Sequence, residues 1–68
     1  MIFDFRKRYL VVGSEFGQED LNLERFKAKD DEAAKNIFFS YWFKYSFFNL
    51  TLYRVTFFAG LKYITDND

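Results

Sequence analysis

A run of 19 residues from Asp30 to Phe48, DDEAAKNIFFSYWFKYSFF, constrains the fold of this chain more than any other segment. Asp30 is suited to cap a helix, because its carboxylate can accept hydrogen bonds from the free amide groups of the first turn. Two acidic residues and two alanines follow, which suit the positive end of the helix dipole and the helical backbone respectively. The sequence therefore predicts one long helix over residues 30–48, closed by Asn49 in the left-handed conformation.

A helix over this run has two apolar faces when its residues are placed at about 100° per step. The broader one is the predicted core face, and it consists of Ala34, Ile37, Phe38, Tyr41, Tyr45 and Phe48, with Trp42 at its edge. The narrower one, which we call the outer stripe, consists of Phe39, Phe43 and Phe47. A single sheet covers only one face of a helix, so the outer stripe needs a covering segment of this chain, a second copy or a foreign partner. Aromatic residues also favour strands, and a helix that stopped near Tyr41 would not form the stripe.

The segments on both sides of the helix have the composition of strands. Apolar and polar residues alternate, or apolar residues form short runs, within residues 2–13 and over residues 21–29, 50–58 and 61–65. A glycine-containing loop over residues 13–20 and the dipeptide Ala59-Gly60 separate these segments. The expected fold is α+β, in the order β-β-α-β-β, with the one long helix packed on a small, mainly antiparallel sheet of three or four strands. At 68 residues the chain is expected to form one domain, 1–68.

Some details of packing follow from the same patterns. Phe26 and Ala28 are expected to face the helix, because they alternate with cations and lead directly into it. Periodicity does not decide which face of segment 50–58 packs on the helix. Phe16, in the first loop, is expected either to plug the edge of the core or to form an exposed contact. Residues 66–68 are expected to form a solvated tail.

The residue types present exclude most catalytic chemistry. The chain has no His and no Cys, which removes the commonest general base, the commonest nucleophile–base pairs and most zinc sites. Gly13 and Gly17 are four residues apart, but no Gly-Lys-Ser/Thr follows them, so they do not form a phosphate-binding loop. We expect a protein that is not an enzyme, with no cofactor, no metal site and no small-molecule substrate.

Charge and composition bear on the partners and the compartment. Ten Lys and Arg balance ten Asp and Glu, which argues against a strongly basic nucleic-acid binder and against an acidic DNA mimic. No segment resembles a signal peptide or a membrane span, and the absence of Cys fits a reducing compartment. A cytoplasmic protein without membrane contact is therefore expected. The preference for Phe, Tyr, Asn, Lys and Ile follows AT-rich coding, and with the short length it fits a phage or mobile-element gene.

The surplus of aromatic residues favours a function in binding. Eleven Phe, five Tyr and one Trp are more than one core of this size needs. The expected function is a small non-catalytic protein-interaction domain that uses Phe39, Phe43 and Phe47 as its contact surface. Its partner would be a larger protein or a second copy in a homo-oligomer such as a homodimer. An accessory or inhibitor protein of a phage or mobile element would work in this way.

The alternative function is binding of single-stranded nucleic acid. Arg25, Lys27 and Lys29 alternate along one predicted strand and would line one face of the sheet. If Arg54 lies on the same face, near Tyr9 or Phe58, cations and rings would form one surface. Such surfaces stack unpaired bases while they hold phosphates. A row of alternating cations is also the usual solvated face of a strand.

Overall fold

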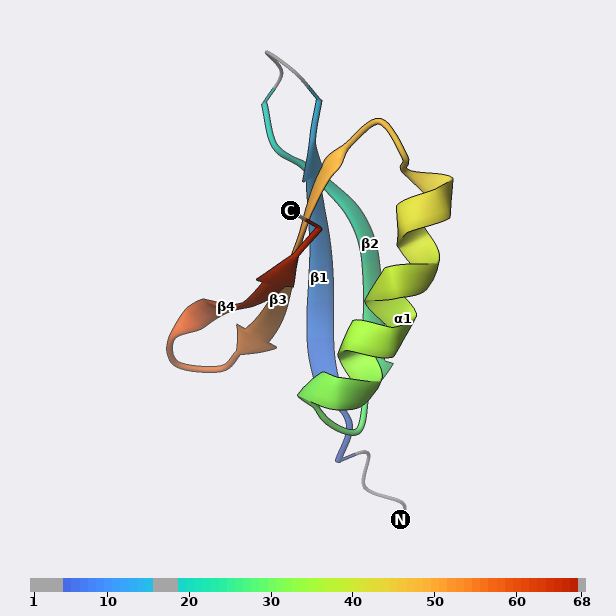
Figure 1. Cartoon of the computed structure of the whole chain (residues 1–68). Helices are drawn as coiled ribbons and strands as arrows, with labels where there is room; N and C mark the ends of the chain where they lie inside the picture. Colours follow the sequence, from blue (N-terminus) through green and yellow to red (C-terminus); the bar gives the residue numbers. More distant parts are fainter. Residues whose placement is uncertain (1–4, 16–18, 68) are drawn as a thin grey trace.

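The computed structural model describes residues 5–15 and 19–67. These residues form one helix and a four-stranded sheet, and the helix lies against the sheet (Figure 1). The elements follow one another as β1 (Lys7–Ser14), β2 (Leu21–Ala28), α1 (Asp31–Lys44), β3 (Asn49–Thr56) and β4 (Gly60–Asp66). The strand order is β2-β1-β3-β4, and every neighbouring pair is antiparallel. The predicted α+β fold and its element order are confirmed, with four strands in the sheet.

Helix α1 begins as the sequence predicted. Asp30 has an extended backbone (φ −156°, ψ 176°), and its carboxylate accepts a hydrogen bond from the Ala33 amide at 2.8 Å. The cap satisfies one of the amide groups that the first turn leaves without an intrahelical acceptor.

The helix ends at Lys44, four residues before the predicted end. The Tyr45 amide still donates to the Tyr41 carbonyl at 2.9 Å, but Tyr45 itself leaves the helical backbone (φ −120°, ψ 49°). The prediction that Asn49 closes the helix in the left-handed conformation is wrong. Asn49 is the first residue of β3, and no described residue other than Gly60 has a positive φ. The aromatic residues after Lys44 have only modest helix propensity, and pairing of β3 with β1 competes for the same chain.

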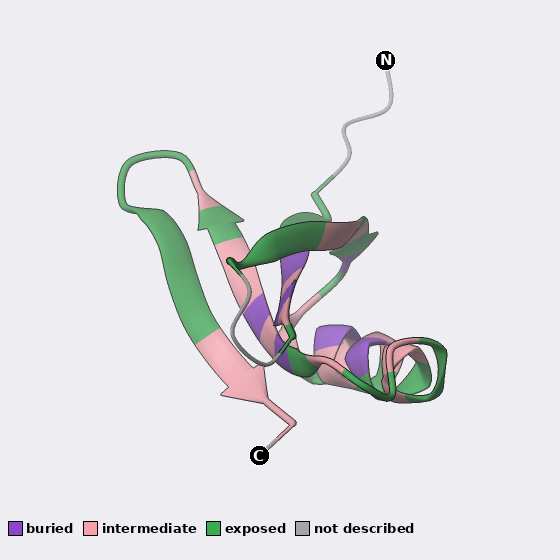
Figure 2. Cartoon of the chain, turned by 90° about the horizontal axis from the view of Figure 1, so that it is seen from above, coloured by how far each residue is buried: buried purple, intermediate pink, exposed green. Residues whose placement is uncertain are grey.

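The core lies between α1 and one face of the sheet (Figure 2). Its members are almost fully buried, and they are Tyr9, Val11, Ala28, Ala34, Phe38, Leu50 and Leu52. The predicted core face of the helix is confirmed, because Ala34 and Phe38 are buried and the other predicted residues are half-buried against the same cluster. Ala28 and Phe26 also face the helix as predicted. The structure resolves the open question about β3, whose Leu50 and Leu52 face the helix.

A ladder of aromatic rings runs along this interface. Tyr9 stacks on Phe26 with ring centroids 5.5 Å apart, and Phe26 contacts Tyr41 at 6.1 Å. The ladder continues from Tyr41 to Tyr45 at 6.4 Å and from Tyr45 to Phe48 at 5.7 Å. A fully buried aromatic ring removes on the order of 150–250 Å² from water, and the partly buried rings remove a share of that area. Large side chains therefore compensate for the small number of core residues. Part of the aromatic surplus is therefore structural.

The turn between β3 and β4 differs from the prediction. Strand β3 ends at Thr56 and not at Phe58. The Thr56 hydroxyl accepts from the Ala59 amide at 3.1 Å and donates to the Gly60 carbonyl at 2.7 Å, which closes the turn. Gly60 has a φ of 71°, a conformation that glycine adopts without steric cost. Phe57 and Phe58 therefore project from the turn, with 91% and 95% of their surfaces exposed.

The prediction of a solvated tail over residues 66–68 is wrong for Asp66 and Asn67. Asp66 belongs to β4, and the Asn67 side chain bridges the start of β3: its Oδ1 accepts from the Leu50 amide at 2.9 Å, and its Nδ2 donates to the Phe48 carbonyl at 3.1 Å. The Asn67 amide also donates to the Leu50 carbonyl at 3.1 Å. The end of the chain thereby holds the segment that leads from the helix into β3. Asp68 lies outside the described residues.

Replacement of Asn67 by alanine is expected to lower the free energy of unfolding by about 1–2 kcal/mol, because it leaves the Leu50 amide and the Phe48 carbonyl without their side-chain partner. Thermal unfolding should detect the loss as a fall in Tm of about 4–8 °C per kcal/mol. Asn22→Ala, at an exposed position of β2, is the matched control and should change Tm little. Equal Tm values for the two variants would contradict the structural role of Asn67.

Candidate functional site

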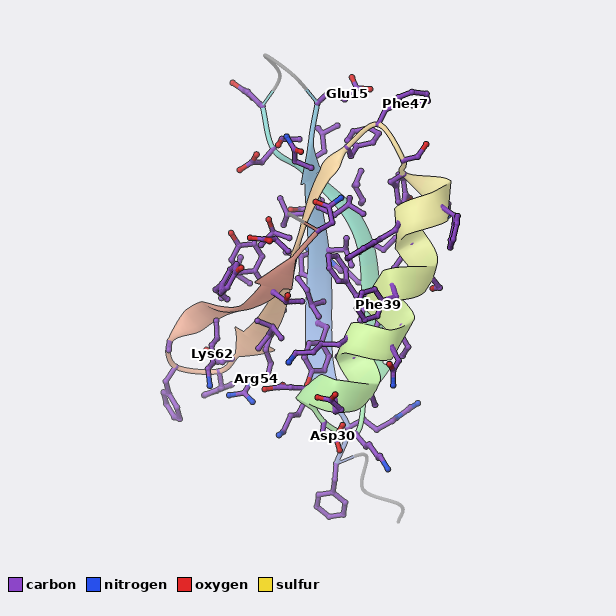
Figure 3. The ribbon with its side chains drawn as sticks, viewed as in Figure 1. Glu15, Asp30, Phe39, Phe47, Arg54 and Lys62 are labelled. Carbon is purple, nitrogen blue, oxygen red and sulfur yellow. The ribbon has the colours of Figure 1, made fainter. Side chains whose placement is uncertain are left out.

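The outer stripe is exposed in the structure. Phe43 and Phe47 leave 92% and 90% of their surfaces open to solvent, and Phe39 leaves 51%. Because the helix ends at Lys44, only Phe39 and Phe43 lie on it, and Phe47 lies in the turn that follows. Figure 3 shows Phe39 at the middle of the helix and Phe47 at the end of the molecule opposite Asp30. No segment among residues 5–15 and 19–67 covers these rings.

Trp42 joins the stripe to the core. Its ring meets Phe38 edge-on at 6.1 Å on the core side and Phe39 edge-on at 4.8 Å on the outer side. The Trp42 Nε1 is buried and has no hydrogen-bond partner in the described part of the chain. Because Phe39 packs against Trp42, it is partly a structural residue. The most exposed part of the stripe is Phe43 and Phe47. Phe16, for which the sequence left two interpretations, lies outside the described residues.

A second surface lies on the face of the sheet opposite the helix, which we call the open face. Strand pairing aligns Arg8 with Lys27 on one side and with Val55 on the other, and the next row aligns Leu10 with Arg25 and Tyr53. These residues alternate with Tyr9 and Val11, which face the helix, so they share the open face.

Tyrosine rings continue the row that contains Arg25, Leu10 and Tyr53. Tyr53 pairs with Tyr63 of β4, and their rings meet edge-on at 6.4 Å. Tyr63 is 55% exposed, whereas Leu10 is only 5% exposed although α1 lies on the other face of the sheet. The open face therefore has an apolar centre, with cations on its β1 and β2 side and tyrosines on its β3 and β4 side.

The structure separates the four cations that the sequence grouped as a nucleic-acid surface. Arg25 and Lys27 lie on the open face, and Lys29 lies just after β2. Arg54 pairs with Tyr9 and lies on the helix side, where its Nη1 is 3.5 Å from Asp31 Oδ1. The condition that Arg54 share a face with Arg25 is therefore not met, because Arg54 alternates with Tyr53 and Val55 along β3.

Asp31 is the centre of a small polar network on the helix side. It accepts a hydrogen bond of 2.6 Å from the Tyr9 hydroxyl. This bond is the largest influence that holds the pKa of Asp31 below its ordinary value of 3.8, and Arg54, Lys7 and Lys62 lower that pKa further. Burial, followed by the bond to Asp31, raises the pKa of Tyr9 above its ordinary value of 10.0. The network fixes Arg54 beside the start of the helix.

A matching contact lies near the other end of the helix. Glu24 of β2 accepts hydrogen bonds of 2.7 Å from the Lys44 ammonium and from the Tyr45 hydroxyl. These two bonds lower the pKa of Glu24 below its ordinary value of 4.5. Both networks connect the helix to the sheet.

Most cations gather at one end of the sheet. Antiparallel pairing brings the start of β1, the end of β2, the end of β3 and the start of β4 to the same end. Eight of the ten cations of the chain belong to this end, which we call the basic end: Arg6, Lys7, Arg8, Arg25, Lys27, Lys29, Arg54 and Lys62. Arg54 and Lys62 lie there side by side in Figure 3, whereas Glu15 lies at the opposite end.

Sequence reasoning missed Arg6, Lys7 and Arg8. The cue was available, because an antiparallel pair joined by one loop brings the start of its first strand beside the end of its second. The predicted order of the two strands would therefore have placed these three cations beside Arg25, Lys27 and Lys29. The neighbouring position of β3 depended on a pairing that periodicity did not specify.

Two adjoining hollows mark the basic end. One, of about 740 Å³, is lined by Arg6, Lys7, Arg8, Arg54, Val55, Thr56 and Phe57. The other, of about 340 Å³, lies over the first row of the open face and is lined by Arg8, Tyr9, Arg25, Phe26, Lys27 and Val55. Arg8 and Val55 line both hollows, so the two adjoin, and we call them together the basic groove. No carboxylate appears among the described residues that line it.

The described residues contain no group of three carboxylates that could hold a metal ion. Within the same residues, no helix combines the length and the apolarity needed to cross a membrane. The candidate surfaces are the outer stripe and the basic groove. Comparisons with models of protein families, with curated proteins and with solved structures find no significant match to this chain.

Proposed function

We propose that the protein is a small non-catalytic protein-binding domain whose contact surface is the outer stripe, Phe39, Phe43 and Phe47. The observation that carries the proposal is the exposure of Phe43 and Phe47, at 92% and 90%. An exposed ring keeps water in contact with apolar surface, and removing that surface from water contributes about 25 cal/mol per Å², from which the entropic cost of association is subtracted. Aromatic side chains are also the residues that dominate the energy of protein interfaces.

The partner is a second copy of this chain or a larger protein, and the stripe serves either of them in the same way. A role as an accessory or inhibitor protein extends the proposal, in that the stripe would occlude a site on the larger partner. The support for an origin in a phage or mobile element is the short length and the AT-rich residue usage. A cytoplasmic location is proposed on the absence of Cys.

The double substitution Phe43→Asp with Phe47→Asp is expected to abolish association and to leave the fold intact, because neither ring belongs to the core. Loss of one aromatic hot spot costs about 2 kcal/mol or more, equivalent to about 30-fold in Kd. Size-exclusion chromatography with light scattering, over a range of protein concentrations, measures self-association. If the wild-type protein is monomeric, capture of a partner from host lysate follows, with the double variant as the negative control.

The matched control is Phe57→Asp with Phe58→Asp. These rings are equally exposed, at 91% and 95%, but they project from the β3–β4 turn and not from the helix side. The control should associate as the wild type does. Equal loss of association in both double variants would show that exposed rings act without regard to position, and unfolding of the Phe43/Phe47 variant would assign the stripe to the core. Either result contradicts the proposal.

A further inference from the structure

We infer that the basic groove and the adjoining open face form a binding site for single-stranded nucleic acid. The site differs from the outer stripe in its residues and lies on another part of the molecule, so the inference does not depend on the proposed protein interaction. Its cations are Arg6, Lys7 and Arg8 of the β1 segment with Arg25 and Lys27 of β2, and its rings are Tyr53, Tyr63 and Phe57.

The charge of the groove selects a polyanion. Arg8 and Lys27 lie opposite each other on β1 and β2, which are separated by about 4.8 Å in a sheet, and Arg25 lies two residues from Lys27 on the same face. No described carboxylate lines the groove, although the chain as a whole has zero net charge. Asp31, the nearest carboxylate to Arg54 in the network above, is already engaged by the Tyr9 hydroxyl and by Arg54. Five cations of the site therefore line one groove, an arrangement that attracts a row of phosphates.

The rings beside the cations favour a strand with unpaired bases. Tyr53 and Tyr63 occupy the same cross-strand row as Arg25, with Leu10 between Arg25 and Tyr53. A chain whose phosphates follow the β1 and β2 cations would carry its bases over β3 and β4, where the tyrosines lie. Phe57, which is 91% exposed, offers a further stacking surface where the groove ends. Stacked bases on aromatic platforms beside a cationic track are the general mode of single-strand binding.

Duplex nucleic acid and an anionic membrane fit the site less well. In a duplex the faces of the bases are covered by their neighbours in the stack, so the tyrosines would have no bases to stack on. A membrane surface would use the projecting rings of Phe57 and Phe58, but it would leave the Arg25 row of the open face, with its tyrosines, without a partner. The juxtaposition of cations and tyrosines across one row of the sheet is the observation that favours a single strand.

The test uses fluorescence anisotropy with a labelled oligothymidylate of about 12 nucleotides and the full chain. Wild-type protein should bind at about 50 mM salt and weaken steeply as salt rises, because each phosphate neutralised contributes about −0.7 to the slope of log K against log salt. Arg8→Gln with Lys27→Gln should reduce the magnitude of that slope by about 1.4. Tyr63→Leu should weaken binding by about 5- to 150-fold, the equivalent of one stacked base, and should leave the slope unchanged.

The matched control is Lys35→Gln with Lys44→Gln, which also removes two positive charges, but from the helix. The slope of log K against log salt should then be the same as in the wild type. Circular dichroism verifies that each variant is folded. Absence of oligothymidylate binding at about 50 mM salt, or an equal loss of slope in the control, would overturn the inference. Tighter binding to duplex DNA, or binding to anionic vesicles without binding to the oligonucleotide, would overturn it as well. Because Phe43→Asp with Phe47→Asp should bind the oligonucleotide normally, a failure of this inference is distinct from a failure of the proposed protein interaction.

Discussion

Replacement of Phe38 by alanine is expected to lower the free energy of unfolding more than any of the other substitutions, by about 3–5 kcal/mol. Phe38 is fully buried at the centre of the contact between the helix and the sheet, where its ring meets Trp42. Removal of a buried Phe side chain costs about 3–5 kcal/mol, because the lost transfer free energy adds to the cost of the cavity. A chain of 68 residues has a total free energy of unfolding of about 3–10 kcal/mol. The substitution therefore removes a large part of the stability, or all of it.

Urea unfolding followed by far-UV circular dichroism measures this effect. The matched control is Phe43→Ala, which removes the same ring from the same helix at a position that is 92% exposed. The control should change the free energy of unfolding by about 0.5 kcal/mol or less. If the two variants lose equal stability, the division of the helix into a core face and an outer stripe is wrong.

Replacement of Tyr9 by phenylalanine is expected to lower the free energy of unfolding by about 1.5 kcal/mol at neutral pH. The change removes the 2.6 Å hydrogen bond to Asp31 and keeps the ring that stacks on Phe26. Hydrogen bonds to charged groups contribute about 1.5–3 kcal/mol, and the lower end applies because the Asp31 side chain is 36% exposed. Thermal unfolding should show a fall in Tm of about 6–12 °C.

The difference in the free energy of unfolding between Tyr9→Phe and the wild type should depend on pH, and the pKa of Asp31 determines the direction. This pKa is lower in the folded protein than its ordinary value of 3.8, so the stability that the charged carboxylate contributes is complete above that value. It is lost as the pH falls through the folded pKa, when a proton binds to Asp31. The stability difference between the two proteins should therefore be full at neutral pH and should shrink below about pH 4.

The alkaline side gives an independent check. The pKa of Tyr9 is higher in the folded protein than its ordinary value of 10.0, so the folded state favours the neutral phenol. The wild type should lose stability as the pH rises above 10, and Tyr9→Phe should lose less over the same range.

A double-mutant cycle tests the bond itself. Asp31→Asn combined with Tyr9→Phe should lower the free energy of unfolding by less than the sum of the two single changes, since both remove the same bond. Additive effects would contradict the network.

The start of the helix and its core face were predicted from the sequence, because both depend on residues close together in the chain. The cap needs only Asp30 and the amide groups of the next turn, and the core face needs only the 3.6-residue period that aligns Ala34 with Phe38. The end of the helix was not predicted correctly. Tyr45 and Phe48 continue the apolar period, but their backbone is governed by the turn into β3 and by contacts with Glu24 and Asn67, which lie about 20 residues away along the chain.

Of the two candidate surfaces, the sequence predicted the outer stripe but not the whole of the basic groove. Phe43 and Phe47 could be identified from the sequence, because a helix of this pattern has more apolar faces than one sheet covers. The basic groove could not be identified in full. Its membership depends on the pairing of β1 with both β2 and β3, which aligns Arg8 with Lys27 and Val55 and assigns Arg54 to the other face.

The sequence by itself determined the α+β class, the element order, the helix start and the residues that pack on the sheet. Each of these follows from local periodicity, capping and turn chemistry. The tertiary structure alone decided the strand order, the face of β3, the role of Asn67 and the gathering of eight cations at one end. The physical reason is that strand pairing joins residues distant in sequence, and a shift of one residue in the register of a strand would exchange the two faces of that strand.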